Sequence, residues 1–304
     1  MSVLKKGLIM LTAGRSLPPP QCPPMGHGPV VFPYKPGPPF DPSYVTFTIA
    51  TRESPQHKPL DPNNLKNVKN KKTIIIIGGW EEHAFSEPSL YFSDLTKAYL
   101  NKSDYNIISV HDYQQMNVSL NENIACTEHI DHCIADLIIS LYQQNKVSLS
   151  NIHIVGHGLG SHIGGGAGSI VFNSLNKKIY RITALELFSS GLEYNMTPKK
   201  QLDKTDAKVV DVIHTYTHQS LGSADFFVNP TTRQPPCCGR LDAGRCDYGI
   251  SIEYFIVTLN SYIKALQCDS VKNFAEDKCS GHETAIFGDN YKGHPKGNFY
   301  LYLY

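Results

Sequence analysis

The 304-residue chain lacks an apolar run long enough to cross a bilayer, and it lacks an excess of charge of either sign. Its longest apolar runs, residues 73–77 and 134–141, have the length of a buried strand and of part of a helix. Lys and Arg total 28 against 27 Asp and Glu, which leaves a net charge of +1. This balance gives no electrostatic case for binding nucleic acid or an anionic membrane surface. We therefore expect neither a transmembrane segment nor a nucleic-acid partner.

The chain also lacks the C-x2-C spacing of zinc sites, although it has eight cysteines, at positions 22, 126, 133, 237, 238, 246, 268 and 279. Disulfide bonds are a better interpretation of these cysteines than a metal, and no cofactor is expected. Three N-x-S/T sequons, at Asn101, Asn117 and Asn195, are compatible with glycosylation, although sequons also arise by chance. We predict secretion, mainly from the cysteines.

Proline is concentrated at the amino end, where 11 of the 20 prolines fall by Pro42. Because proline propagates neither a helix nor a central strand, residues 1–44 are predicted to form an irregular or extended arm. Lys5 and Lys6, followed by an apolar stretch, resemble a weak signal segment within residues 1–14, but no A-x-A site follows. Residues 45–304 are predicted to form one domain.

Strand and helix patterns alternate along residues 45–304. Apolar runs predict strands at 45–51, 73–77, 105–110, 152–155, 179–187 and 208–213. Helical spacing of apolar residues predicts helices after Pro88, over 130–141 and over 252–263. Cys126 and Cys133 precede or overlap the second helix, where seven residues would separate them by about 10 Å, too far for a disulfide. The alternation indicates a mostly parallel sheet with helices on both faces.

Residues 151–168, NIHIVGHGLGSHIGGGAG, combine a short apolar strand, a glycine-rich turn and the start of a helix. Nucleophilic hydrolases place a serine at the centre of such a turn, as G-x-S-x-G. Here Gly158 stands at that central position, between Gly156 and Gly160. The same glycines could form a dinucleotide fingerprint with Glu186 as the ribose-binding carboxylate, although Ser161 replaces the third glycine.

A series of ordered motifs resembles the pancreatic lipase superfamily, which includes insect lipases and phospholipases A1. GHGLGSHIGGGAG is similar to the family's G-H-S-L-G-A-H-x-x-G-x-x-G segment. Matches in the same order are ATRESP, IIIIGGW, RITALEL, LDKTDAKVVDVIHT, GSADFFVNP, CDYGISIEYF and PKGNFYLYLY. The resemblance covers roughly residues 45–304 and implies an α/β-hydrolase fold.

The resemblance implies that the positions of the catalytic triad are Gly158, Glu186 and Tyr248. Glycine has no nucleophile, and glutamate is a tolerated replacement for aspartate. Free tyrosine titrates near pH 10, against about 6.5 for histidine, so it is a poor base at neutral pH. Loss of the nucleophile or the base typically costs about 10⁶ in turnover. No catalytic residue is therefore assigned, and the backbone N–H groups of Trp80 and Leu159 would remain from the oxyanion hole.

Other residues near these motifs are weaker candidates. Ser161 is expected to face packing, His157 to order the turn, and His214 does not match the family's catalytic histidine. Asp203 and Asp206 resemble two carboxylates of a calcium site in some members. The third carboxylate is missing, with Pro198 near its position, so a solvated acidic loop is the better interpretation and no metal is assigned.

The family's lid loop is bracketed by a disulfide, and the resemblance places it between Cys238 and Cys246. Seven residues are too few to cover a hydrophobic cleft, so interfacial activation is not expected. Cys238, Cys246, Cys268 and Cys279 are the disulfide candidates. The chain ends after the closing strand, so no C-terminal β-sandwich domain is expected.

We predict a secreted, catalytically inactive lipase homologue that binds lipid or another apolar ester, or that serves in storage. Insect yolk proteins resemble this pattern, because they are lipase-like chains without the elbow serine. An active carboxylic-ester hydrolase with a noncanonical catalytic set stays open, and a Ser or Cys near Trp80 and Leu159 would support it. A lipid- or hormone-ester-binding module is the other alternative. A site filled by Phe188 and Tyr248 would favour storage over ligand binding.

Overall fold

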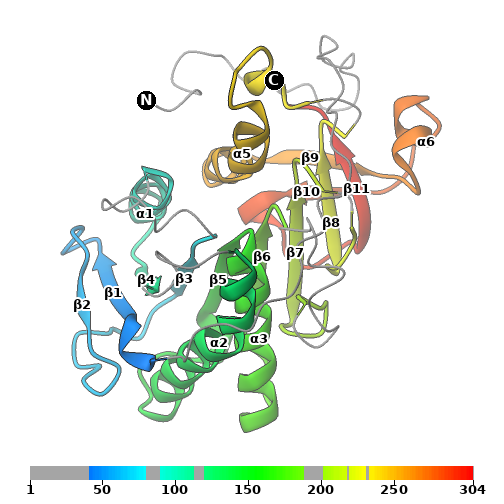
Figure 1. The fold of residues 1–304 in the computed structure, drawn as a ribbon. Helices are drawn as coiled ribbons and strands as arrows, with labels where there is room; N and C mark the ends of the chain where they lie inside the picture. Colours follow the sequence, from blue (N-terminus) through cyan, green and yellow to red (C-terminus); the bar gives the residue numbers. More distant parts are fainter. Residues whose placement is uncertain are drawn as a thin grey trace.

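A computed structural model describes residues 41–79, 90–112, 120–187, 201–217, 219–230 and 233–303. Over these residues eleven strands form one sheet, in the order β10-β9-β11-β8-β7-β6-β5-β3-β4-β1-β2 (Figure 1). The strands are β1 (Val45–Thr51), β2 (Lys58–Leu60), β3 (Thr73–Ile77), β4 (Asn106–Asp112), β5 (Ile152–His157), β6 (Arg181–Leu185), β7 (Val209–His214), β8 (Ala224–Val228), β9 (Ile263–Gln267), β10 (Thr284–Phe287) and β11 (Gly297–Leu301).

The middle of the sheet, from β4 through β3, β5, β6, β7 and β8 to β11, is parallel. Antiparallel strands flank it: β1 and β2 on one side, β9 and β10 on the other. In a parallel sheet the carboxyl ends of neighbouring strands lie at one edge, which is where α/β proteins build their sites. The end of β5 therefore lies beside the ends of β3 and β6.

Helices cover both faces of the sheet (Figure 1). The helices of the described residues are α1 (Leu90–Lys102), α2 (Leu120–Gln143), α3 (Leu159–Leu175), α5 (Ala243–Thr258) and the short α6 (Val271–Ala275). Side chains of α2 and α3 pack into one apolar core, and those of α1 and α5 pack into a second. Strand β3 divides its isoleucines between the two, with Ile75 and Ile77 in the first core and Ile74 and Ile76 in the second. Burial on both faces explains why TIIII shows no alternation.

This is the α/β-hydrolase architecture that the motifs implied: a mostly parallel central sheet with helices on both faces, and no β-sandwich is evident among the described residues. The predicted helix over 252–263 was too long, because α5 ends at Thr258 and Ile263 begins β9. Cys126 and Cys133 both lie within α2, so a bond between them is excluded by the helical rise. The predicted arm, residues 1–44, and Pro88 fall largely or wholly outside the described residues.

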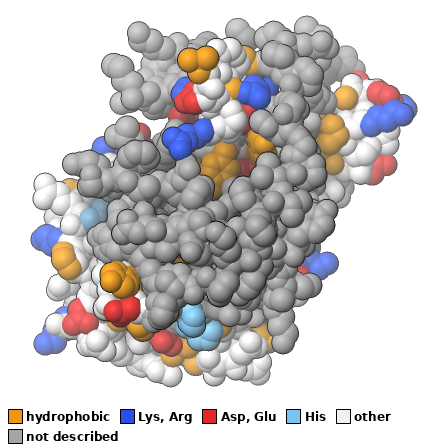
Figure 2. Space-filling model, viewed as in Figure 1, with side chains coloured by type: hydrophobic (Ala, Val, Ile, Leu, Met, Phe, Trp, Pro, Cys, Tyr) orange, Lys and Arg blue, Asp and Glu red, His pale blue; other side chains and the backbone are white. Residues whose placement is uncertain are grey.

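None of the described helices has the length and apolar character needed to span a membrane. On the described part of the face in Figure 2, acidic and basic side chains are interspersed. That part of the surface agrees with the small net charge of the chain.

Candidate functional site

The turn between β5 and α3 is an elbow with a positive φ at its centre. Gly158 has φ 54° and ψ −118°, a backbone conformation that favours glycine, and it stands at the N-cap of α3. Its N–H donates to the carbonyl oxygen of Glu186 at 2.8 Å, which fastens the elbow to the end of β6. A Cβ on Gly160 would lie 2.4 Å from the carbonyl oxygen of Gly78, so the close approach to the end of β3 requires glycine there.

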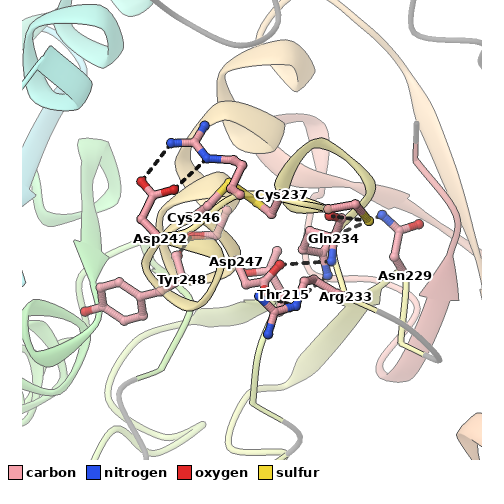
Figure 3. Close-up of a disulfide and its surroundings, with 12 residues drawn as sticks. Thr215, Asn229, Arg233, Gln234, Cys237, Asp242, Cys246, Asp247 and Tyr248 are labelled. Carbon is pink, nitrogen blue, oxygen red and sulfur yellow. Dashed lines mark hydrogen bonds and ion pairs between the residues drawn. A yellow bond between two sulfur atoms is a disulfide. The ribbon is translucent and has the colours of Figure 1, made fainter. Parts of the chain in front are cut away.

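The side chain of Tyr248 occupies the space above the elbow. Its Oη lies 1.6 Å from the point where a Cβ on residue 158 would stand, and 2.8 Å from the equivalent point on Gly79. Tyr248 belongs to α5 and is directed away from the Cys237–Cys246 disulfide at the start of that helix (Figure 3). The structure thus brings the Gly158 and Tyr248 positions into contact, and glycine at 158 is what leaves room for the phenol.

Glu186 follows β6, is fully buried and has a positive φ of 47°. Its Oε2 accepts from the N–H groups of Thr215 at 2.6 Å and Tyr216 at 2.7 Å and from the Thr215 hydroxyl, and its Oε1 accepts from the Thr217 N–H at 3.0 Å. This carboxylate therefore holds the loop that follows β7. A triad acid would instead orient a basic side chain.

A chain of hydrogen bonds connects this loop to the residue before Tyr248. The Thr215 carbonyl accepts from the Gln234 side-chain amide at 2.8 Å, and the Gln234 N–H donates to Asp247 Oδ1 at 3.0 Å (Figure 3). Asp247 also lies 3.4 Å from the Arg233 guanidinium. Burial raises the pKa of Asp247 to about 6, against an ordinary value of 3.8. Sequence reasoning missed this connection, because Gln234 and Asp247 carry no motif.

His157 lies directly before the elbow and contacts Tyr248 in two ways. Its Nε2 is 3.2 Å from the Tyr248 carbonyl oxygen, and the centres of the two rings are 4.3 Å apart. A carbonyl oxygen only accepts hydrogen bonds, so Nε2 is the protonated nitrogen. The expectation that His157 orders the turn agrees with this contact between the elbow and α5.

The other weak candidates are engaged in packing. Ser161 is fully buried and its hydroxyl donates to the Gly156 carbonyl at 3.0 Å, which agrees with the expectation that it faces packing. His214 lies between Asp225 Oδ1 at 2.9 Å and the Thr217 hydroxyl at 3.3 Å, and its ring stacks on a phenylalanine. Both imidazole nitrogens of His214 therefore have partners, so this histidine has a structural role.

The disulfide at the start of α5 differs from the expected bracket. Cys246 pairs with Cys237, with their Cα atoms 5.5 Å apart, rather than with Cys238. Cys237 ends a short 3-10 helix, Pro235–Cys237, whose buried face turns its side chain toward α5. Cys238 is itself disulfide-bonded. Cys268 and Cys279 pair with each other, so all four candidates are in disulfides, with one partner misassigned.

Several predicted site residues lie outside the described residues, namely Trp80, Asn117, Asn195, Phe188 and Pro198. Leu159, the other backbone donor of the predicted oxyanion hole, is the first residue of α3. Asn101 is exposed near the end of α1.

The acidic loop at 203–206 is less solvated than predicted at one position. Asp206 is buried, its Oδ2 accepts from the Asp203 N–H at 2.7 Å, and burial raises its pKa to about 7. Asp203 Oδ1 accepts a hydrogen bond from the Thr205 N–H at 2.8 Å.

Within the described ranges, the one grouping of three metal-capable residues is Cys268, Asp269 and Cys279, and its two cysteines form a disulfide with each other. That grouping is not a metal centre.

The family model named Lipase matches residues 40–299, which span the elbow, the Glu186 loop and α5. The chain belongs to the lipase family. It is 27% identical over 289 residues to Phospholipase A1 of Polybia paulista, covering 86% of this chain and 88% of that protein. It is 30% identical over 254 residues to Lipase member H-A of Xenopus laevis, covering 78% of this chain and 53% of that protein. The chain thus spans about half the length of this second relative.

Among solved structures, a putative carboxylesterase from Lactobacillus plantarum aligns with 69% of this chain and 76% of its own, with 13% identity and a TM-score of 0.35. Membership of the lipase family makes the dinucleotide interpretation of the elbow glycines wrong. In that interpretation Glu186 would bind a ribose. Its carboxylate instead accepts hydrogen bonds from the loop at 215–217.

Proposed function

We propose that this lipase-family chain does not hydrolyse esters by a serine mechanism and acts instead by binding or storage. The observation that carries the proposal is the position of Tyr248 Oη, 1.6 Å from the point where a side chain on residue 158 would begin. A serine at 158 and a tyrosine at 248 are mutually exclusive in this geometry. The two replacements therefore form one consistent arrangement of the elbow.

The described serines around the elbow support this proposal. The Ser161 hydroxyl donates to the Gly156 carbonyl, and the Ser251 hydroxyl donates to the Tyr248 carbonyl at 3.2 Å. Both side chains are fully buried. Neither hydroxyl is directed at the space above Gly158, where a serine that takes over the role of the missing nucleophile would have to act.

Between binding and storage, the filled elbow favours storage. Tyr248 Oη occupies the space that the side chain of a catalytic serine at position 158 would take. Secretion belongs to the same proposal, because the Cys237–Cys246 and Cys268–Cys279 disulfides persist in oxidising compartments. Asn101, with its exposed sequon, is the described candidate for glycosylation.

The alternative function is an active carboxylic-ester hydrolase of the phospholipase A1 type. The observation that favours it is the likeness to Phospholipase A1 of Polybia paulista over 86% of this chain. In this alternative, a side chain near the elbow other than those at the three triad positions would perform the chemistry. Steady-state turnover would then be within a few orders of magnitude of an ordinary lipase.

Steady-state hydrolysis of a soluble short-chain ester and of a phosphatidylcholine by the purified full chain tests the proposal. We expect no turnover above the uncatalysed rate from the wild type. The double variant Gly158→Ser/Tyr248→His restores a nucleophile and a base and removes the clash, so a gain of activity by it shows that the remaining site is intact. Multiple turnovers by the wild type would overturn the proposal and support the alternative.

A further inference from the structure

The segments that lead into the parallel strands concentrate positive charge. Those before β3, β4, β5, β6, β7 and β11 are residues 61–72, 102–105, 144–151, 176–180, 201–208 and 288–296. Together they contain twelve lysines against five aspartates and no glutamate. The rest of the chain has 16 Lys and Arg against 22 Asp and Glu. The net charge of +1 thus conceals a separation of charge, because these segments alone have an excess of seven positive charges.

The fold gathers these segments at one edge of the sheet, which we call the amino edge. The N–H of Asn106, at the start of β4, donates to the carbonyl of Lys72, directly before β3, at 3.0 Å. The N–H of Lys208, directly before β7, donates at 3.1 Å to the carbonyl of Ile179, in the segment before β6. The elbow follows the opposite end of β5, so the amino edge is a separate surface of the protein.

Several lysines of the amino edge are exposed and have no anionic partner. Lys71 pairs with Asp104 and Lys102 pairs with Asp289, each at 2.6 Å. The exposed lysines of these segments that have neither an ion pair nor a side-chain hydrogen bond, as far as the structure describes the chain, are Lys66, Lys72, Lys204, Lys208, Lys292 and Lys296. Their ammonium groups are available to an anion from outside the protein.

The charges of different segments are close enough to act on one another. Although much of its side chain is exposed, partial burial lowers the pKa of Lys292. The cations Arg181, Lys72 and Lys102 lower this pKa further, and Asp289 opposes them. The amino edge therefore holds repulsion between cations, which a bound anion would relieve.

The lysines form a row along the sheet. In the order of the sheet, they precede β11, β7, β6, β3 and β4. Neighbouring strands lie about 4.8 Å apart, so the six steps from β11 to β4 span about 29 Å. A row of this length matches an extended polymer with repeated negative charges rather than a single small anion.

The side chains of the amino edge narrow the class of polymer. All twelve cations of these segments are lysines, a residue depleted at protein–protein interfaces. Of the described residues, the exposed large hydrophobic side chains are Tyr44, Phe172, Leu241 and Tyr262, and none of them belongs to these segments. The segments thus offer neither aromatic faces on which nucleic-acid bases would stack nor apolar side chains that would enter a bilayer. A sulfated polysaccharide needs neither, because its repeated anionic groups are attracted by charge.

We propose that the amino edge binds a sulfated polysaccharide along its row of lysines. The inference goes beyond the proposed function, because the elbow and the amino edge lie at opposite ends of the parallel strands. Turnover of an ester reports on the elbow, whereas binding of the polysaccharide reports on the lysines. Failure of one is therefore distinguishable from failure of the other.

The test is isothermal titration of the purified full chain with a heparin dodecasaccharide, at several salt concentrations between about 50 and 200 mM. We expect binding that weakens steeply with salt, because each ammonium that meets an anionic group releases a counterion. The triple variant Lys72→Gln/Lys208→Gln/Lys296→Gln should bind about tenfold or more weakly. It should also lower the slope of log affinity against log salt by about 2 to 3, close to one for each lysine.

The matched control removes three exposed lysines from outside the amino edge. Lys58→Gln/Lys264→Gln/Lys272→Gln has the same change in net charge, and these lysines lie on β2, β9 and α6. This control should keep both the affinity, within about twofold, and the salt slope. Near-ultraviolet circular dichroism checks that both triple variants are folded.

Two further outcomes decide against the proposal. Absence of heparin binding by the wild type at about 50 mM salt, or equal weakening in the two triple variants, would overturn it. Vesicles of phosphatidylserine and phosphatidylcholine are the second probe. If these vesicles bind through the same three lysines while the dodecasaccharide does not bind, the partner is an anionic membrane surface and the polysaccharide assignment is wrong.

Discussion

Two polar regions lie along the central strands. One is built on Arg181 at the start of β6, and the other surrounds the elbow between β5 and α3. Arg181 Nε and Nη2 donate to the two carboxylate oxygens of Asp211, each at 2.7 Å. Its remaining N–H groups donate to the carbonyls of Gly288, Asp289 and Tyr291. All five guanidinium donors are therefore satisfied inside the protein.

The elbow region is also hydrogen-bonded, but different groups take part. The Glu186 carboxylate accepts hydrogen bonds from backbone N–H groups of the loop at 215–217, and the aromatic ring of Tyr248 stands over Gly158. In a working hydrolase, the nucleophile, the base and the acid are oriented toward one another and toward substrate. Here the acid stabilises a loop.

The comparison shows that a fold can hydrogen-bond its buried polar groups without orienting side chains for catalysis. The Arg181 region is complete because each group is matched to a partner of fixed geometry, which stabilises a pairing between β6, β7 and the segment at 288–291. The elbow keeps its backbone and its buried hydrogen bonds, with glycine and tyrosine at the two positions that the motif resemblance gives to the nucleophile and the base. Under the proposed function, a lipase-family fold persists without its reaction.

Removing Arg181 should give the largest loss of stability, and it tests whether the buried Arg181 region stabilises the fold. Arg181→Met leaves the Asp211 carboxylate buried without its cation, and such a loss costs about 3–5 kcal/mol. Urea unfolding at neutral pH measures it. Lys69→Met is the control, because the Lys69–Glu53 pair is exposed and should contribute about 1 kcal/mol or less. Similar losses for both variants would show that burial of the Arg181 pair has no particular consequence.

A side chain at Gly158 should give the next largest effect and tests the elbow side. Gly158→Ala adds a Cβ within 1.6 Å of Tyr248 Oη at a positive φ, and we expect it to destabilise by about 2–4 kcal/mol. Gly239→Ala is a matched control, because Gly239 also has a positive φ of 73° but no atom within 4 Å of the added Cβ. That control should cost only about 1 kcal/mol.

The contribution of Tyr248 to this cost can be separated in a double variant. Adding Tyr248→Ala to Gly158→Ala removes the clash, so the combined loss should be smaller than the sum of the two single losses. Thermal unfolding of the four proteins measures the coupling. Additive losses would mean that the phenol does not stand over the elbow.

The sequence predicted the main architecture well, because its signals are local and periodic. The strand at 73–77 and the elbow glycines are encoded by composition within a few residues, and the ordered lipase motifs identified the family. The helix end at Thr258 was missed, since Ile263 continues the helical spacing although it begins β9. The Cys237–Cys246 pairing was missed because adjacent cysteines are distinguished only by the direction in which the folded backbone turns each side chain.

At the candidate site, the sequence supplied the residue types but not their contacts. The motif resemblance predicts that glycine stands at the serine position and tyrosine at the histidine position. That the phenol oxygen lies at the vacant side-chain position depends on the distance between α5 and the elbow, which no local pattern encodes. The Glu186 contacts depend likewise on a loop 29 to 31 residues further along the chain.

Glu186→Gln sharpens the comparison by removing charge at the elbow without changing shape. Four donors reach this carboxylate, and hydrogen bonds to a charged group contribute about 1.5–3 kcal/mol. We expect a loss of about 2 kcal/mol in urea unfolding and faster amide hydrogen exchange at Thr215, Tyr216 and Thr217. Unchanged exchange at these amides would mean that Glu186 does not hold the loop.

The smallest expected effect concerns Asp206, a buried carboxylate packed on α3, the helix that starts at the elbow. Asp211 faces a guanidinium, whereas Asp206 accepts a hydrogen bond from the Asp203 N–H and burial raises its pKa to about 7. The folded state therefore keeps a proton that the unfolded state, with the ordinary value near 3.8, has released. Stability from this group is present at low pH and is lost as pH rises from about 4 to 7.

Between pH 5 and pH 6 the wild type should lose about 1 kcal/mol of unfolding free energy relative to Asp206→Asn, whose side chain does not titrate. Urea unfolding of both proteins at the two pH values measures this difference. Parallel pH dependences would show that Asp206 is ionised in the folded protein, as a carboxylate with an adequate polar partner would be.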